Sequence, residues 1–275
     1  HKATGEFVEF ITEPGQISPP QITGAAVGNQ DPSLISYWKF DENAGAIAAD
    51  SADGNNGELK AIAVSGQTIL PTWVAGKIGS ALSFNGKVGS SIIRDYVIKN
   101  PINNFPTDAI TEAFWIKTTD KKDGILSYAA KGGSANAFLI LNSGSITILK
   151  GRGKRNTLVA VNDGQWHFVA VTWQSIDGAT MLYVDGQLKY TSPTPFAKGT
   201  KIGAIGSLVI GQDQDSLGGG FEASQDFSGT IDEVRIYNKV LSEEEINSLY
   251  QNYVSPPPKP EPLSITTTQL PNANI

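Results

Sequence analysis

The stretch Trp166-His-Phe-Val-Ala-Val-Thr-Trp173 is the strongest fold signal in the chain, because β-branched and aromatic residues dominate it. A second run, Thr180-Met-Leu-Tyr-Val184, follows and ends at Asp185-Gly186, a dipeptide typical of tight β-turns. Similar runs lie at 36–40 and 113–117. Short strands separated by turn residues predict a sandwich or a barrel.

Composition supports an all-β fold. The chain of 275 residues is 40% hydrophobic and 17% charged, and its 29 glycines and 15 prolines favour short strands joined by turns. One short helix is predicted near 242–251, because Ser242 and Glu245 have the spacing of a capping box before an apolar stripe. Residues 34–254 are therefore expected to form one β-rich domain.

Both ends of the chain are interpreted as linkers. Residues 1–33 contain four prolines among scattered glycines and are expected to be a leader or linker. Over 255–275 we expect a Pro-rich extended spacer and the start of a truncated following domain, whose first strand resembles that of an immunoglobulin-like repeat. The chain opens without a signal-peptide pattern and reads as an excised or mature piece.

Charge and residue usage exclude several classes of function. A formal net charge of -6 argues against nucleic acid as a partner, since phosphates demand a basic surface. No stretch approaches the roughly 20 apolar residues of a membrane span, and the absence of cysteine excludes a disulfide framework. Lys150, Arg152, Lys154 and Arg155 form one basic cluster, which is either the solvated tip of a hairpin or a ligand-contact loop.

Oxygen donors concentrate in segment 208–225, Leu-Val-Ile-Gly-Gln-Asp-Gln-Asp-Ser-Leu-Gly-Gly-Gly-Phe-Glu-Ala-Ser-Gln. Calcium takes about six to eight oxygens from carboxylates, amides and backbone carbonyls, and glycines let carbonyls turn inward. The segment therefore predicts a Ca²⁺ site. The alternative is an ordinary surface turn whose acids are only solvated.

Segment 208–225 also closely resembles the calcium loop of the pentraxins, and the match continues through 226–250. The resemblance implies that the metal is held by the side chains of Asp213, Asp215 and Gln225 and by the backbone carbonyl of Gln214. Residues 34–254 as a whole are similar to the laminin G-like domains. That superfamily implies a concanavalin A-like jelly roll, an antiparallel sandwich of two sheets.

The stretch 166–173 looks like the pentraxin signature, except that Ala170 stands where the family has a cysteine. The position of that cysteine's partner falls at Ala113, so the resemblance implies a disulfide-free version of the same core. His167 is the only internal histidine, and its neighbourhood lacks partners for catalysis or zinc. It is interpreted as a polar residue beside a core strand.

The resemblance breaks at 127–139, where the family supplies an Asp-Asn pair to its metals. Asn136 can stand for the asparagine if one residue is inserted, but Ser134 or Ala135 replaces the aspartate. Either one ion binds, or two bind weakly, or the ligand completes the shell. Leu141 lies near the position of an aromatic residue of the family's phosphocholine pocket, and that specificity is not carried over.

The sequence also predicts a second, structural metal site. Laminin G-like domains often hold a calcium between an early loop and the last strand, which here implies the side chains of Asp41, Asp50, Asp53, Asn56 and Asp232. The alternative is a metal-free turn stabilised by Asx hydrogen bonds.

These observations favour a calcium-dependent binding module of an extracellular or cell-surface protein, with no catalytic residues. Its expected ligand is a glycan or an anionic group such as a lipid headgroup, bound near Ser134 and Leu141 with help from Lys154 or Arg155. One alternative is a structural or adhesion spacer. Another is a glycoside hydrolase, but Asp232 and Glu233 are adjacent and would point to opposite faces of a strand. The sequence sets neither the oligomeric state nor the ligand.

Overall fold

The computed structural model describes residues 31–62, 68–88, 91–92 and 94–254. The leader predicted over 1–33, apart from its last three residues, and the spacer predicted over 255–275 lie outside this range. The strands of the first half are β1 (Leu34–Trp38), β2 (Ile47–Ala48), β3 (Gly57–Ile62), β4 (Thr72–Ala75), β5 (Ser80–Asn85), β6 (Lys87–Val88), β7 (Ser91–Ile92), β8 (Arg94–Ile102), β9 (Ala109–Thr118) and β10 (Gly124–Ala130). Those of the second half are β11 (Phe138–Leu141), β12 (Thr147–Lys150), β13 (Gly153–Asn156), β14 (Trp166–Gln174), β15 (Thr180–Val184), β16 (Gln187–Thr191), β17 (Gly206–Ile210) and β18 (Ser228–Tyr237), with a 3₁₀ turn, η1 (Ala223–Gln225), and one helix, α1 (Glu243–Val254).

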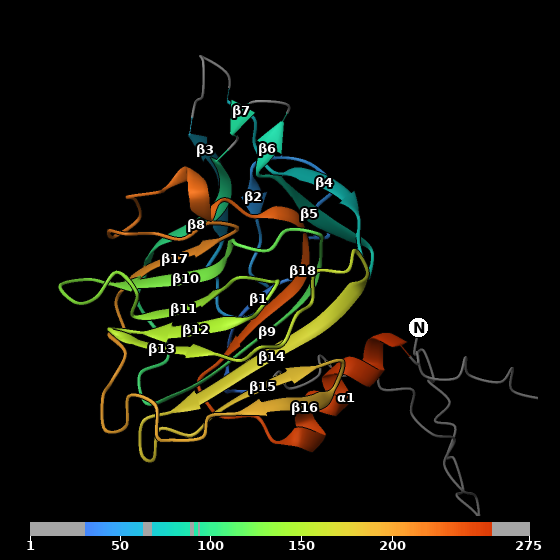
Figure 1. The fold of residues 1–275 in the computed structure, drawn as a ribbon. Helices are drawn as coiled ribbons and strands as arrows, with labels where there is room; N and C mark the ends of the chain where they lie inside the picture. Colours follow the sequence, from blue (N-terminus) through green and yellow to red (C-terminus); the bar gives the residue numbers. More distant parts are fainter. Residues whose placement is uncertain (1–30, 63–67, 89–90, 93, 255–275) are drawn as a thin grey trace, which may run out of the picture. The chain divides into compact units, whose positions relative to one another are not determined.

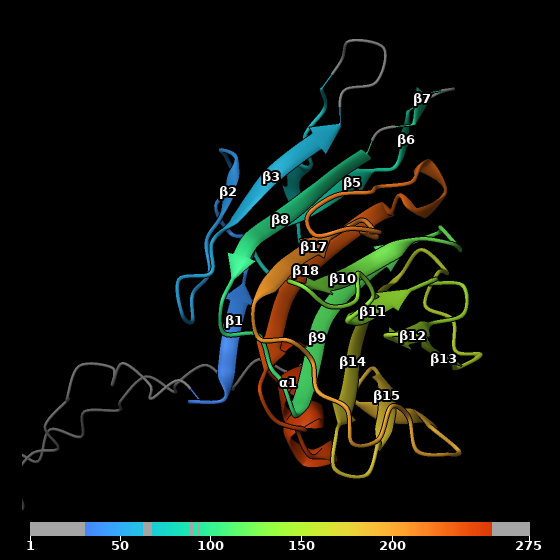
Figure 2. The same ribbon diagram turned by 90° about the vertical axis from the view of Figure 1, so that its left-hand side faces the viewer.

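Two eight-stranded antiparallel sheets form the sandwich that the sequence predicted (Figures 1 and 2). The first sheet has the order β16-β15-β14-β9-β18-β5-β4, and β1 also pairs with β18. The second has the order β13-β12-β11-β10-β17-β8-β3-β2. Neighbours such as β9 and β18 are far apart in sequence, so the prediction of a jelly roll is confirmed.

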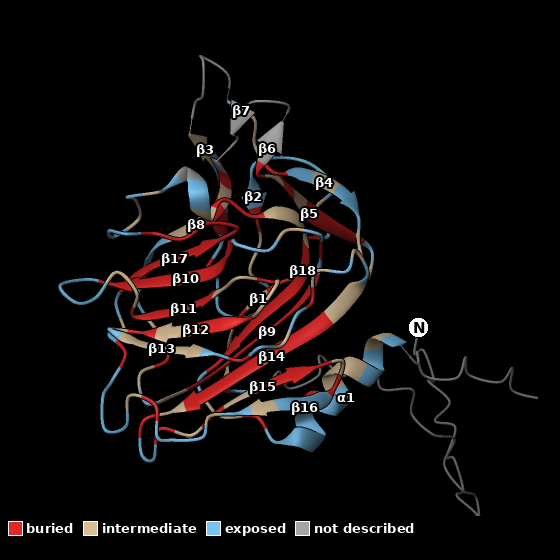
Figure 3. Cartoon of the chain, in the orientation of Figure 1, coloured by how far each residue is buried: buried red, intermediate tan, exposed pale blue. Residues whose placement is uncertain are grey.

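The core lies between the sheets, where large apolar side chains exclude water (Figure 3). Phe114, Val169 and Trp173 come from the first sheet, and Ile125, Phe138 and Ile210 come from the second, all at most 1% exposed. Burial of such side chains stabilises the fold by about 1.5–3 kcal/mol each. Every residue of β10 and β17 is buried, which indicates that their outer face is covered as well.

Helix α1 covers the outer face of the first sheet. Tyr250 and Tyr253 pack on the ring of Trp115, with centroids 5.8 and 6.3 Å apart. The predicted capping box is present, since Glu245 N–H donates to Ser242 Oγ at 3.2 Å and Ser242 N–H donates to Glu245 Oε2 at 2.7 Å. The helix extends to residue 254, three residues beyond the prediction, because its last turn still packs on the sheet. In the described residues no helix is both long and apolar enough to cross a membrane.

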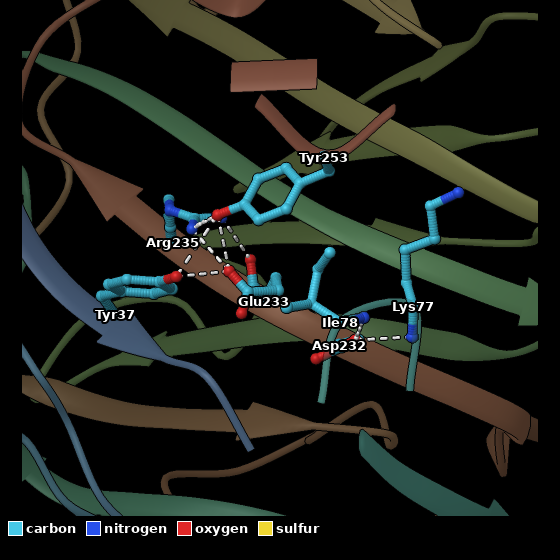
Figure 4. A network of polar contacts seen from close by, with 7 residues as sticks. All are labelled: Tyr37, Lys77, Ile78, Asp232, Glu233, Arg235 and Tyr253. Carbon is cyan, nitrogen blue, oxygen red and sulfur yellow. Dashed lines mark hydrogen bonds and ion pairs between the residues drawn. The ribbon is translucent and has the colours of Figure 1, made fainter. Parts of the chain in front are cut away.

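A polar network anchors the same helix to the sheet (Figure 4). Tyr253 OH donates to Glu233 Oε2 at 2.7 Å, and Tyr37 OH donates to the same oxygen. Arg235 pairs with Glu233 at 2.5 Å and contacts Tyr253 OH. The neighbouring Asp232 instead accepts two backbone N–H groups of the 76–80 turn, so the two adjacent carboxylates have separate partners.

Ala113 and Ala170 are directly opposite each other in the β9–β14 ladder, and both are fully buried. The pairing agrees with the alignment that placed these alanines at the two cysteine positions of the pentraxins. The core at this point is filled by two small apolar side chains.

His167 lies at the start of β14 between two carboxylates. Its Nδ1 is 2.8 Å from Asp185 Oδ2, and its Nε2 is 3.1 Å from Asp163 Oδ1. Burial lowers the pKa of His167, but the hydrogen bonds and charges of Asp185 and Asp163 outweigh burial, and the net shift is upward. No further metal-binding side chain of the described residues joins this group.

Replacing His167 by asparagine should therefore destabilise the fold more in acid than in alkali. Because the folded-state pKa lies above the unfolded value, the stabilisation is full below about pH 6.5 and is lost as the pH rises through the folded pKa. Urea unfolding at about pH 5.5 and about pH 9 measures it, with Gln165→Ala as the control. An equal loss at both pH values would contradict the ion pairing.

Candidate metal-binding site

Segment 211–225 leaves the end of β17 and folds back beside β8 (Figure 1). Gly211 starts it with φ +88°, and a Cβ there would lie 2.4 Å from Phe84. The Gln214 side chain then holds the loop to the sheet, since its Nε2 donates to Ser127 O at 2.8 Å and to Ser207 O at 2.9 Å. Its Oε1 accepts Gly218 N–H at 2.9 Å. Gln214 is completely buried, so the loop is fixed from within.

Asp213 lies at the centre of the loop and is 4% exposed. Its Oδ1 accepts Ser127 Oγ at 3.3 Å, and its Oδ2 accepts Gln225 Nε2 at 3.0 Å. Burial, and next the charge of Asp215, raise the pKa of Asp213 to about 6. A buried carboxylate beside a second carboxylate is an arrangement that a cation would stabilise.

Two amide oxygens, one in this loop and one in the loop after β10, suit an oxygen-seeking cation. Gln225 Oε1 and Asn136 Oδ1 are both buried and lack a hydrogen-bond partner. Buried polar atoms are usually satisfied, so such oxygens need an explanation. They fit the residue types that Ca²⁺ prefers, although across the described parts of the chain no three acidic or histidine side chains form a ready metal cage.

Of the four side chains predicted to bind the metal, three lie on one loop and the fourth, Asn136, lies on another. Asp213 and Gln225 are hydrogen-bonded, and Asp215 is exposed on the same loop. Asn136 lies at the end of the loop after β10, where its N–H donates to Ser134 Oγ and its carbonyl accepts Gly151 N–H at 2.6 Å. In the described residues no hydrogen bond links Asn136 to segment 211–225, so its role as a ligand stays a prediction.

The predicted ligand-binding residues lie in different surroundings. Lys154 lines a cavity of about 310 Å³ together with Lys121 and Lys122, next to the half-buried Leu141 on β11. Arg155 instead is held by the 192–196 segment, where its Nε donates to Ser192 Oγ at 2.8 Å. Its guanidinium also lies 4.6 Å from the ring centroid of Phe196.

The residues of the second predicted metal site fall into two groups. Both oxygens of Asp50 accept backbone N–H groups, including Tyr37 at 2.6 Å and Asn55 at 2.8 Å, in the pattern of an Asx turn. Asn56 Oδ1 accepts Asp50 N–H, and Asp53 accepts an Asn104 amide. These bonds support the metal-free alternative for the 50–56 loop.

Asp41 and Asp232 form the other group, around the 76–80 turn; Figure 4 shows Asp232 beside Lys77 and Ile78 of that turn. Asp41 Oδ1 accepts Ser80 N–H at 3.0 Å, and Asp232 Oδ2 accepts Lys77 N–H at 2.8 Å. Burial, opposed by hydrogen bonds, raises the pKa of Asp232 to about 7, and its Oδ1 is buried without a partner. A metal at this pair stays a prediction.

Sequence reasoning missed two residues of the site. Ser127 is fully buried on β10, and its Oγ links Asp213 to the Gln214 N–H at 3.2 Å. Glu222 is exposed in the same loop, and its charge contributes to the raised pKa of Asp213. Glu222 stands three residues before Gln225, so counting every carboxylate of the loop would have found it.

Comparisons with known proteins identify the family and the fold of this chain. Residues 87–258 match the model of the Pentaxin family. The Sushi, von Willebrand factor type A, EGF and pentraxin domain-containing protein 1 of Rattus norvegicus is 38% identical over 170 residues, which cover 60% of this chain and 5% of that protein. The chain thus spans a small part of this relative.

Two solved structures share the fold. The heptameric SAP-like pentraxin of Limulus polyphemus has a TM-score of 0.52 at 23% identity, covering 61% of this chain and 80% of its own. Domain 4 of an extracellular arabinanase from Geobacillus stearothermophilus, solved with arabinotriose, has a TM-score of 0.56 at 19% identity, covering 80% of this chain and 98% of its own. With its jelly roll and the family match over more than half of its length, the chain belongs to the pentraxin family.

Proposed function

We propose that residues 34–254 are a calcium-dependent binding module that acts without a covalent step. Pentraxins are ligand-binding proteins, which sets the class of function. The observation that carries the proposal for this chain is the buried Asp213, hydrogen-bonded to Gln225 and close to the charges of Asp215 and Glu222. When bound there, Ca²⁺ would neutralise these carboxylates and present open coordination positions to ligand oxygens.

The ligand that fits this site is anionic or polyhydroxylated, either a carbohydrate or a group bearing phosphate or carboxylate. Ser134 and Ala135 stand where the family has a carboxylate, so more of the metal's charge would be left for the ligand to compensate. The cavity at Lys121, Lys122 and Lys154 adds three ammonium groups, two from the loop between β9 and β10 and one from β13. Charge-assisted hydrogen bonds from these lysines would favour an acidic ligand.

An extracellular or cell-surface location accords with this proposal, since Ca²⁺ sites of modest affinity fill at extracellular calcium levels. A structural or adhesion spacer is the alternative if the metal only rigidifies the loop. Catalysis is less well supported, because Asp232 and Glu233 are each bound to separate structural partners.

An array of glycans and lipid headgroups, probed with the protein in calcium and again in chelator, tests the proposal. We expect binding to acidic or vicinal-diol ligands in calcium, and its loss in chelator and in the Asp213→Asn/Asp215→Asn variant. Binding that survives chelation unchanged, or an array without any calcium-dependent ligand, would refute it. The second outcome would favour the spacer.

A further inference from the structure

A cavity of about 350 Å³ opens at the rim of the second sheet, outside the calcium loop. It lies where β10 ends, where β12 turns into β13, and beside the 197–203 segment. Four cationic side chains and two hydroxyls line it, and no acidic residue does: Lys131, Ser134, Lys150, Arg152, Thr200 and Lys201. The lining of this basic pocket contains no residue of segment 211–225. The pocket does border one predicted metal ligand, Asn136, whose N–H donates to Ser134 Oγ and whose carbonyl accepts Gly151 N–H.

Lys150 forms the floor of the basic pocket and is 6% exposed. Its Nζ donates to Thr200 Oγ1 at 2.8 Å and lies 4.4 Å from the ring centroid of Trp173. In the part of the chain that the structure describes, no carboxylate pairs with this ammonium group. A buried charge without a counter-ion is costly, and the Thr200 hydroxyl, the Lys201 backbone carbonyl at 3.4 Å and an aromatic face, all uncharged, compensate it only in part.

Burial lowers the pKa of the Lys150 ammonium, which agrees with a charge that the protein itself does not neutralise. An anion in the pocket would supply the missing counter-charge. The protein has a net charge of -6, so a pocket lined by four cations and no acidic residue differs in charge from the protein as a whole.

The rim of the basic pocket is open and rich in donors. Lys131 and Arg152 are exposed, on the loops that follow β10 and β12. Gly132, which also lines the pocket, has φ +70°, and nothing lies within 4 Å of where its Cβ would be, so the space around it is open. Lys201 pairs with Asp108 at 3.0 Å and contributes less charge than the other three.

We propose that the basic pocket binds a sulfate or phosphate monoester carried on a sugar, independently of calcium. A tetrahedral oxyanion accepts hydrogen bonds in several directions, which suits an ammonium group below, a guanidinium at the side and hydroxyls between them. A flat carboxylate would use fewer of these donors. The volume exceeds that of a bare ion and lies in the usual range of small-molecule sites.

Isothermal titration calorimetry in chelator tests this assignment with inorganic sulfate, inorganic phosphate, N-acetylglucosamine 6-sulfate, glucose 6-phosphate and unmodified N-acetylglucosamine. We expect the esters to bind, the neutral sugar not to bind, and the affinity to fall with added salt. The ester that binds with the higher affinity shows whether the pocket prefers a sulfate or a phosphate group. The probes contain no calcium, so failure here leaves the calcium-dependent proposal standing, and the reverse also holds.

Two variants and a control locate the binding. Lys150→Met keeps the aliphatic stem over Trp173 and should weaken ester binding at least about tenfold, the usual worth of a charged hydrogen bond. Arg152→Ala changes an exposed residue that folding does not need, and should weaken binding about threefold to tenfold. Lys189→Met removes the same charge from exposed β16 and should change the affinity less than about twofold.

Three results would overturn the proposal: no ester binding in chelator, equal weakening by Lys189→Met and Arg152→Ala, or binding that appears only with calcium and is lost in Asp213→Asn/Asp215→Asn. If Lys150→Met does not fold, the ester affinity of Arg152→Ala, compared with that of Lys189→Met, tests the proposal.

Discussion

Replacing Arg235 by methionine is expected to lower the free energy of unfolding by about 3–5 kcal/mol, the usual cost of removing one partner of a buried ion pair. The side chains of Arg235 and Glu233 are 5% and 2% exposed. The variant leaves the Glu233 carboxylate buried with only two tyrosine hydroxyls as donors. Urea unfolding followed by circular dichroism measures the loss.

The double variant Glu233→Gln/Arg235→Met separates charge burial from general damage. It removes both charges, so it should recover a large part of the stability that Arg235→Met loses. The exposed pair of Lys239 and Glu245 is the matched control, and Lys239→Met should cost less than about 1 kcal/mol. If the double variant were less stable than Arg235→Met alone, the pair would contribute through packing rather than charge.

Local sequence patterns predicted several elements of the fold. The run at 166–173 became β14, and the capping box at Ser242 and Glu245 begins α1 where the spacing predicted. The alignment of Ala113 with Ala170 anticipated a contact between strands that lie 57 residues apart, because the two positions are opposite each other in the ladder. These features could be predicted because they depend on residues close together in the sequence or on a known family motif.

Contacts between distant residues were not predictable in the same way. Ser127 reaches Asp213 across 86 positions, and Tyr37 reaches Glu233 across 196. The residues that surround Ser127 or Tyr37 in the sequence do not indicate which distant residue each one contacts. The same limit applies to Asp50, whose oxygens turned out to bind backbone N–H groups, since an aspartate in a turn and an aspartate on a metal look alike in sequence.

Calcium should raise the thermal stability of this protein, and the change Asp213→Asn with Asp215→Asn should abolish that response. At a calcium concentration about 100 times the dissociation constant, binding to the folded state alone contributes about 2.7 kcal/mol. For a domain of this size that corresponds to roughly 5–10 °C in Tm. Differential scanning calorimetry in calcium and in chelator measures the shift.

The calcium-free state provides a second and opposite expectation for the same variant. Because burial and the charge of Asp215 raise the pKa of Asp213 to about 6, the ionised carboxylate disfavours the folded state above that pH when no cation is bound. In chelator at neutral pH the double variant should thus be at least as stable as the wild type, while in calcium it should be less stable. Asp41→Asn is the comparison. If calcium no longer stabilised Asp41→Asn but still stabilised the double variant, the calcium site would lie at the 76–80 turn instead. Equal Tm values of the wild type in calcium and in chelator would rule out a calcium site in either place.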